Sequence, residues 1–368
     1  MRDRVTGGGL VDHGRLLDEH SVPALLQEQV RRFTAESLRA KPVRPFDARS
    51  VIDVLQATEG RSVLAVDIGG DKIAFSLFEV RDKAVRETGN VFVRKGNGGE
   101  GYVDVLRQVS KLASLRHVPV GISFAGPTDG TRPVAGPNLP VFIREFSGAF
   151  GGDFANLFPA VELANDAEAG MMAAALEAAR RYPETEDVIY VINGSGLGGA
   201  VLARGTICAA EPGHVPVIDE LNVFGQDRPC GMDGASYVCL EAVAASKAGV
   251  EDIWLQRTGE SATGHEIAAR YLAGDQLAFA LYDNSARVLA HVIGGMAEAF
   301  GLLDPARPLA VVGHGGIFHV PGYGERVRAI SDNNLVCTPR ILLSKEFSAN
   351  TCLEGAAIAA AVKDVEFV

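Results

Sequence analysis

The chain has 368 residues, of which 47% are hydrophobic and 22% charged, so it is long enough to form two lobes rather than one small core. Its 46 acidic and 35 basic side chains give a formal net charge of −11, which argues against nucleic acids and anionic membranes as partners because both need a basic face. Five cysteines, a charged and glycine-rich start, and no apolar run long enough to span a bilayer predict a cytoplasmic protein with reduced thiols.

Residues 1–60 differ in pattern from the rest and predict an N-terminal helical extension packed on the main body. One helix is expected to begin at Ser21, with Pro23 in its first turn. A second helix is expected over residues 48–57.

Beyond the extension, the pattern becomes that of strands and helices in alternation. A three-stranded meander is expected first, followed by a helix and a strand, over residues 62–68, 73–80, 84–94, 102–115 and 118–126. Later elements are a helix after residue 165, a strand at 187–193 with a hairpin partner at 199–205, a helix at 285–300, a strand at 309–316 and a helix ending near 362. Because the order recurs loosely from residue 187, we predict two related α/β lobes around a cleft, over residues 61–165 and 166–368.

Three glycine-rich turns each follow an apolar strand, at residues 67–70, 194–199 and 313–316. Glycine lets backbone N–H groups approach a polyphosphate closely because no side chain intervenes. None of the turns ends in the Gly-Lys-Ser/Thr of a Walker loop, and the second lies between two strands rather than before a helix, which disfavours dinucleotide binding. Three such turns therefore indicate phosphate binding of another kind.

Two further segments carry candidate chemical groups. Asn165-Asp166 lies between a strand and a helix, where Asp166 is either a general base for a substrate hydroxyl or only the N-cap of the helix. His214, Cys230 and Cys239 have a spacing that suggests zinc, although tetrahedral zinc needs a fourth ligand, such as Cys208 or a carboxylate. Buried thiols without metal are the alternative.

Taken in this order, the segments resemble the ROK family of sugar kinases, within the actin-like ATPase superfamily, over about residues 63–362. "DIGGDKI" and "GSGLGGAVL" are similar to the two phosphate motifs, and "NDAEAG" is similar to the catalytic segment. "AGPNLP", "EPGH", "CLEAVAAS" and "LLDPARPLAVVGHGG" are similar to further family segments. The resemblance implies a two-lobed actin-like (ribonuclease-H-like) α/β fold and an ATP- and Mg²⁺-dependent kinase, and homodimers are common in the family.

The resemblance also implies a role for each matching residue. Asp166 is the implied general base, and the sugar hydroxyls are implied to be held by Asn138, Asn165, Glu211, His214 and Glu241. The phosphates are implied to contact Gly69, Gly70, Lys72, Gly194, Ser195, Gly196, Gly198 and Gly199, with Asp67 near magnesium. Gly313, Gly315 and Gly316 are implied to lie beside the adenosine.

Four features depart from the family pattern. Arg228 replaces the first cysteine of the zinc segment and extra residues precede Cys239, so that without zinc His214 would serve the sugar alone. His314 replaces a usual glycine, and the extension over residues 1–60 is unusual for the kinases. Asp71 replaces a threonine, where its carboxylate would repel the γ-phosphate, take part in Mg²⁺ coordination, or pair with Lys72 or a backbone N–H and turn away.

Three functions follow from these observations. The first is an ATP-dependent kinase acting on a hydroxyl of a hexose, amino sugar or sugar-like cyclitol, in central metabolism or in antibiotic biosynthesis. The second is a sugar-binding pseudokinase that has lost turnover, and the third is a sugar-sensing transcriptional regulator. Asp166 favours the first, because a binding module has no need of a base.

Overall fold

The computed structural model describes residues 44–136, 139–217, 222–230, 236–304, 306–334 and 340–363. The helix expected from Ser21 lies outside these residues, whereas the second predicted helix is confirmed as α2, Ala48–Ala57. Asp47 is the N-cap of α2, and its side chain accepts a hydrogen bond from the backbone N–H of Arg49.

The first sheet has the strand order β4-β3-β2-β6-β9, with β5 also paired to β3. Its strands are β2 (Ser62–Ile68), β3 (Lys72–Arg81), β4 (Ala84–Glu87), β5 (Phe92–Lys95), β6 (Val120–Phe124) and β9 (Val161–Asn165). The β2–β3 pair is an antiparallel hairpin, and β6 and β9 continue the sheet in parallel. The single third strand expected over residues 84–94 was wrong: β4 and β5 pair with different halves of β3, and the "TGN" segment between them belongs to neither.

The second sheet repeats this plan, with the order β1-β12-β11-β10-β13-β14. Its strands are β1 (Arg44–Pro45), β10 (Asp187–Asn193), β11 (Leu197–Ala203), β12 (Thr206–Ala210), β13 (Leu309–His314) and β14 (Arg340–Leu343). β10 forms a hairpin with β11 and lies parallel to β13, as β2 does with β3 and β6. A separate two-stranded ribbon joins β7 (Thr128–Asp129) to β8 (Arg132–Pro133). The predicted pair of related α/β units is therefore present.

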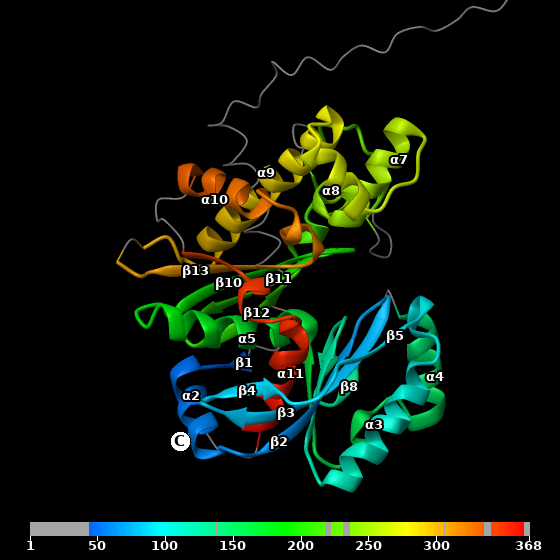
Figure 1. The fold of residues 1–368 in the computed structure, drawn as a ribbon, viewed down its shortest axis with the longest axis vertical. Coiled ribbons are helices and arrows are strands. Elements are labelled where there is room, and N and C mark those ends of the chain that lie inside the picture. The colour runs from blue at the N-terminus through cyan, green and yellow to red at the C-terminus, as the bar shows by residue number, and fades with distance from the viewer. Residues whose placement is uncertain are drawn as a thin grey trace, which may run out of the picture.

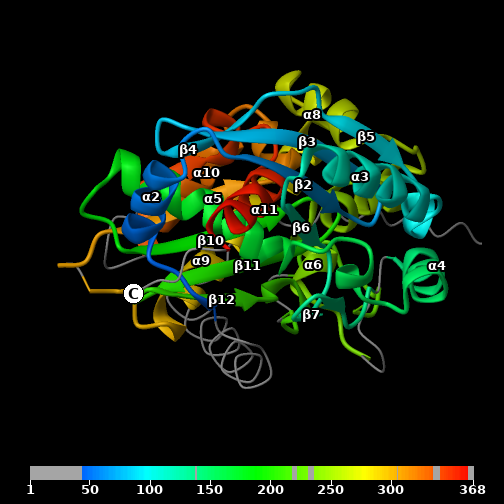
Figure 2. The same ribbon diagram turned by 90° about the horizontal axis from the view of Figure 1, so that it is seen from below.

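Helices cover both sheets and fill the space between them (Figure 1). α5 (Asp166–Arg181) and α11 (Thr351–Val362) lie between the sheets, and α3 (Tyr102–Arg116) and α4 (Pro140–Phe150) cover the far face of the first. The far face of the second sheet is covered by α6 (Leu240–Ala244), α7 (Ile253–Thr258), α8 (Gly264–Leu272), α9 (Gln276–Ala299) and α10 (Tyr323–Asn334). Figure 2, which views the molecule from below, also shows α5 and α11 side by side. The helix expected near Ser285 begins earlier, because Asp275 caps α9 through the backbone N–H of Ala278.

The central helices approach each other through small residues. α11 is buried on nearly all of its surface, which suits a helix packed between two layers. A β-carbon added to Gly355 of α11 would overlap the carbonyl oxygen of Ala169 in α5, and one added to Gly121 of β6 would overlap the carbonyl oxygen of Ala356. Glycine at these positions therefore lets α11 contact both α5 and the first sheet at backbone distance.

Replacing Gly355 by Ala is expected to destabilise the protein by about 1–3 kcal/mol or more, because the added methyl group meets backbone that cannot move aside. Gly148→Ala in α4 is the matched control, since nothing lies within 4 Å of its added β-carbon. Urea unfolding of both variants measures the difference. Equal stability of the two variants would show that α5 and α11 are not closely packed.

Candidate active site

The carboxyl ends of β2, β6 and β9 bring the first polar residues of the site together. Asp67 lies opposite Ser123 in the parallel register, and the Ser123 hydroxyl donates to Asp67 Oδ1 at 2.9 Å. The Asn350 amide donates to Asp67 Oδ2 at 3.0 Å, and Asn350 is the N-cap of α11. Both oxygens of this buried carboxylate are thus fixed, one by the sheet and the other by the central helix.

Asp166 is the first residue of α5, and the structure distinguishes it from the helix cap. Asn165 is the N-cap: its Oδ1 accepts from the backbone N–H of Ala167 at 3.0 Å, and its amide donates to the carbonyl of Gly126 at 3.0 Å. Asp166 Oδ1 also accepts from Ala167 N, at 2.8 Å. A half-buried carboxylate in the first turn of a helix interacts favourably with the helix dipole.

Charged side chains gather around Cys352 of α11 and Tyr190 of β10. Burial raises the pKa of the Cys352 thiol, and the nearby carboxylates of Asp67 and Asp166 raise it further, whereas Lys72 opposes them. Burial likewise raises the pKa of Tyr190, to which Cys352 and then Asp166 add. Asp67, Lys72 and Asp166 therefore lie within electrostatic reach of Cys352, and Asp166 also lies within reach of Tyr190 on the strand that leads into the second glycine-rich turn.

The first glycine-rich turn is closed by a hydrogen bond from Gly69 N to the carbonyl of Lys72 at 2.9 Å. Asp71 and Lys72 are exposed at the turn, and the carbonyl of Asp71 accepts from Gly96 N at 3.2 Å. Burial raises the pKa of Tyr102 to about 12, with the Asp71 carboxylate as the next contribution. Asp71 therefore lies near Tyr102.

The second glycine-rich turn joins β10 to β11 and lies beside two of the predicted sugar ligands. A β-carbon added to Gly196 would lie 2.9 Å from Glu241 Oε2, and one added to Gly198 would lie 3.9 Å from Glu211 Oε2. Leu197 N donates to Glu241 Oε2 at 3.3 Å, which ties α6 to the turn. Gly194 N donates to the carbonyl of Gly196 at 2.9 Å and closes it.

The third turn, at the end of β13, packs directly on the end of β10. Gly315 has φ +113°, a conformation that favours glycine, and an added β-carbon there would overlap the carbonyl oxygen of Asn193. The Asn193 side chain is buried, donates to the carbonyl of Ala244 at 3.0 Å and accepts from Ser246 N at 3.0 Å. The second and third turns are therefore held together through Asn193.

The predicted metal ligands also meet in space. One ligand atom from each of His214, Cys230 and Cys239 lies within 4.8 Å of the others. His214 Nδ1 is 3.4 Å from the sulfur of Cys230, a separation that fits two ligands of one tetrahedral zinc ion. Burial raises the pKa of the Cys239 thiol to about 12, and binding Zn²⁺ would reverse this by favouring the thiolate. Arg228 forms an ion pair with Asp252 at 2.6 Å.

Sequence reasoning covered part of this arrangement. The structure brings Asp67, Lys72 and Asp166 near Cys352 of α11 and places Glu211 and Glu241 beside the second turn. Asn138 lies outside the described residues. Ser123 and Asn350, the two partners of Asp67, were not predicted from the sequence. Asn350 had a usable signal, because an Asn before a run of small residues is a typical N-cap.

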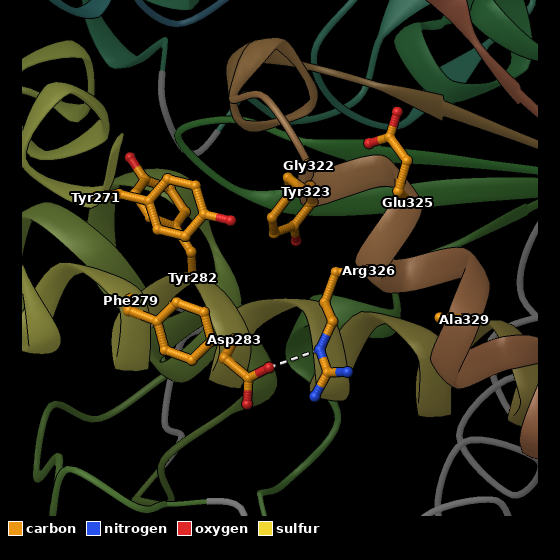
Figure 3. Close-up of a pocket in the computed structure, with 9 residues that line it drawn as sticks. All are labelled: Tyr271, Phe279, Tyr282, Asp283, Gly322, Tyr323, Glu325, Arg326 and Ala329. Carbon is orange, nitrogen blue, oxygen red and sulfur yellow. Dashed lines mark hydrogen bonds and ion pairs between the residues drawn. The ribbon is translucent and has the colours of Figure 1, made fainter. Parts of the chain in front are cut away.

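A separate cavity of about 290 Å³ lies between α8, α9 and α10 (Figure 3). Figure 3 shows Asp283 of α9 and Arg326 of α10 meeting at its edge, where their ion pair measures 2.7 Å. None of the residues implied as sugar, phosphate, adenosine or zinc ligands lines it. Its connection to the site is Tyr323, whose hydroxyl contacts Ser285 Oγ at 2.9 Å and Asn193 Nδ2 at 3.4 Å.

The sequence from residue 63 to residue 362 matches the ROK family. The chain belongs to this family. It is 27% identical over 259 residues to the kanosamine kinase of Amycolatopsis mediterranei, covering 67% of this chain and 78% of that protein. It is 26% identical over 270 residues to the N-acetyl-D-glucosamine kinase of Erwinia tasmaniensis, covering 68% of this chain and 82% of that protein.

The crystal structure of a ROK family glucokinase from Streptomyces griseus, in complex with glucose and AMPPNP, has the same fold. The TM-score is 0.61 at 23% identity, over 80% of this chain and 98% of that one. These findings confirm the predicted family, the two-sheet fold and the class of enzyme, an ATP-dependent sugar kinase. Among the described residues of this ROK kinase, every helix is too short or too polar to cross a membrane.

Purified protein supplied with zinc is expected to bind about one ion per chain at the His214, Cys230 and Cys239 cluster. Cys239→Ser should lose most of this zinc and lower the melting temperature, because metal binding contributes to folding. Cys208→Ser is the control, since Cys208 is buried but lies outside the cluster. Elemental analysis after dialysis measures the zinc content of each variant. The same zinc content in both variants would show that this cluster is not the zinc site.

Proposed function

We propose that this ROK kinase transfers the γ-phosphoryl group of ATP to a hydroxyl of a hexose-like sugar, with Asp166 as the general base. The observation that carries the proposal is the position of Asp166: it begins a helix at the edge of the first sheet, near Tyr190 of the second. A carboxylate there can accept the proton of an attacking hydroxyl while the glycine-rich turns hold the phosphates.

The phosphate-binding role of the turns is supported by their backbone. In the turn after β10, a β-carbon added to Gly196 would meet the Glu241 side chain, and in the turn after β13 one added to Gly315 would meet the Asn193 carbonyl. Both positions therefore favour glycine. Lys72 supplies a cation at the first turn. Phosphoryl transfer depends mainly on positioning and charge stabilisation, which backbone donors and a lysine can provide.

Magnesium would neutralise charge on the transferring phosphoryl group, and Asp67 is the residue proposed to hold it. Asp67 suits this role because carboxylate oxygens are preferred ligands of Mg²⁺. Each oxygen of the buried carboxylate accepts one hydrogen bond, which leaves lone pairs for an ion or its bound water. Ser123 and Asn350 then act by fixing the orientation of the carboxylate.

The sugar is proposed to lie against Glu211, Glu241, Asn165 and His214, together with Asn138. Carboxylate and amide groups can each bond a hydroxyl, and a site built this way rejects analogues that lack one. Two glutamates beside one turn also favour a substrate with an amino substituent, because an ammonium group offsets their charge. The similarity to a kanosamine kinase and to an N-acetyl-D-glucosamine kinase supports an amino sugar as the substrate. A role of this chain in antibiotic biosynthesis is proposed on the similarity to the kanosamine kinase.

Asp166→Asn is expected to lower kcat by about 100- to 10,000-fold, because the amide cannot accept the hydroxyl proton, while sugar binding remains. Asp104→Asn is the control: Asp104 also lies in the first turn of a helix, but on the exposed surface of α3. ADP release and sugar binding are measured for both variants. Turnover retained by Asp166→Asn would remove Asp166 from the mechanism.

Asp71→Thr, which restores the family residue, is expected to leave kcat unchanged and to lower KM for ATP by at most about fivefold. Asp71 is exposed and lies near Tyr102, so its repulsion of phosphate in water amounts to about 1 kcal/mol or less. Steady-state kinetics at several Mg²⁺ concentrations test this. If kcat falls sharply in this variant and excess Mg²⁺ restores it, Asp71 instead takes part in binding the metal.

A further inference from the structure

His314 occupies a position between the two tightly packed glycines that end β13. An added β-carbon on Gly313 would overlap the ring of Phe318, and one on Gly315 would overlap the carbonyl of Asn193. The backbone on either side of His314 is therefore fixed by its neighbours, and the side chain extends from a rigid support. The resemblance described above implies glycine at this position, so the imidazole of His314 departs from the implied pattern.

Two contacts hold the imidazole ring. Its Nδ1 lies 2.7 Å from the hydroxyl of Ser344, a buried residue at the start of the short helix η7 (Ser344–Glu346). The ring also stacks on Tyr190, with centroids 6.1 Å apart and planes at 22°. Tyr190 is anchored in turn by a 2.6 Å hydrogen bond between its hydroxyl and that of Thr351 in α11.

These contacts leave the second ring nitrogen for another partner. The hydrogen bond to Ser344 uses Nδ1, and no group in the described part of the chain bonds Nε2. When the Ser344 hydroxyl donates to Nδ1, the neutral ring carries its proton on Nε2 and becomes a donor there. We take the ring in this tautomer, in which Nδ1 accepts from the Ser344 hydroxyl.

The charges that face the ring come from both units. The pKa of His314 is lowered to about 4, chiefly by burial and then by Lys72 of the first turn and His319 of the helix η6 (Gly316–His319). The ring is thus neutral at physiological pH, and the Lys72 ammonium lies within electrostatic reach of it. A donor on the third glycine-rich turn, within electrostatic reach of the lysine of the first, suits an anion.

We propose that His314 Nε2–H donates a hydrogen bond to a phosphate oxygen of ATP, so that it acts with Lys72 as a phosphate-binding residue that the family pattern lacks. This inference rests on the proposed function, because it assumes that the phosphates of ATP lie between the turns. It also gives Ser344 a role as a positioning residue.

The test compares ligands with and without phosphates. Binding of ATP and of adenosine is measured calorimetrically for the unmodified protein and for His314→Phe, which keeps an aromatic ring for Tyr190 but has no donor. The affinity for ATP is expected to fall about tenfold to a hundredfold, and the affinity for adenosine is expected to be unchanged. His314→Gln should recover part of the loss because its amide can donate.

Two further variants separate a phosphate contact from a packing role. His319→Phe is the matched control, since His319 is exposed on the same segment, and its affinity for ATP should equal that of the unmodified protein. Ser344→Ala should weaken ATP binding less than His314→Phe does, and should again spare adenosine. A melting temperature for each variant checks that it has folded.

The inference is overturned if His314→Phe binds both ligands as the unmodified protein does, or if it weakens both equally. Because no sugar is present, this outcome is independent of turnover. Unmodified protein that binds ATP but phosphorylates no sugar would contradict the proposed function and leave the phosphate contact standing. Failure of the unmodified protein to bind ATP would contradict both.

Discussion

The close contact between α5 and α11 is the constraint on which the rest of the structure depends. Gly355 and Ala169 bring the two helices to backbone distance, and Gly121 brings α11 against the first sheet. The N-terminal end of α5 carries Asp166, and the N-cap of α11, Asn350, holds Asp67. One carboxylate begins α5 and the other is hydrogen-bonded to the N-cap of α11. The close packing of these two helices therefore fixes the separation of the two carboxylates on which the proposed chemistry depends.

The second sheet is tied to this centre by buried polar groups rather than by apolar packing alone. Asn193 bonds the carbonyl of Ala244 and the N–H of Ser246, and its own carbonyl packs against Gly315, so one residue connects α6, β10 and the third turn. A buried polar group that loses its hydrogen-bond partner costs free energy, so these bonds favour one arrangement of the three elements over others. Asp71 breaks the family pattern outside this network, on an exposed turn, where a charge is tolerated at little cost.

The sequence was sufficient for the overall plan because each strand and helix has a strong local pattern. α2, β10 and α11 were predicted closely, since their periodicity, caps and small-residue content agree. The division into β4 and β5 was not predictable, because it depends on how β3 is shared by two partners. Likewise the contacts of Ser123 with Asp67 and of His314 with Ser344 join residues distant in sequence, and no local signal predicts such pairs. His214, Cys230 and Cys239 were predicted as candidate ligands from the sequence, but only the structure shows that their ligand atoms lie within 4.8 Å of one another.

The most direct test of the account is a measurement of ADP release by the purified protein with ATP, Mg²⁺ and a panel of hexoses, amino sugars and cyclitols. The account predicts ADP release that depends on one class of sugar, with an equal amount of sugar phosphate detected by phosphorus NMR. Binding of a sugar without ADP release would contradict it, and would identify the site as one that recognises the sugar without transferring phosphate.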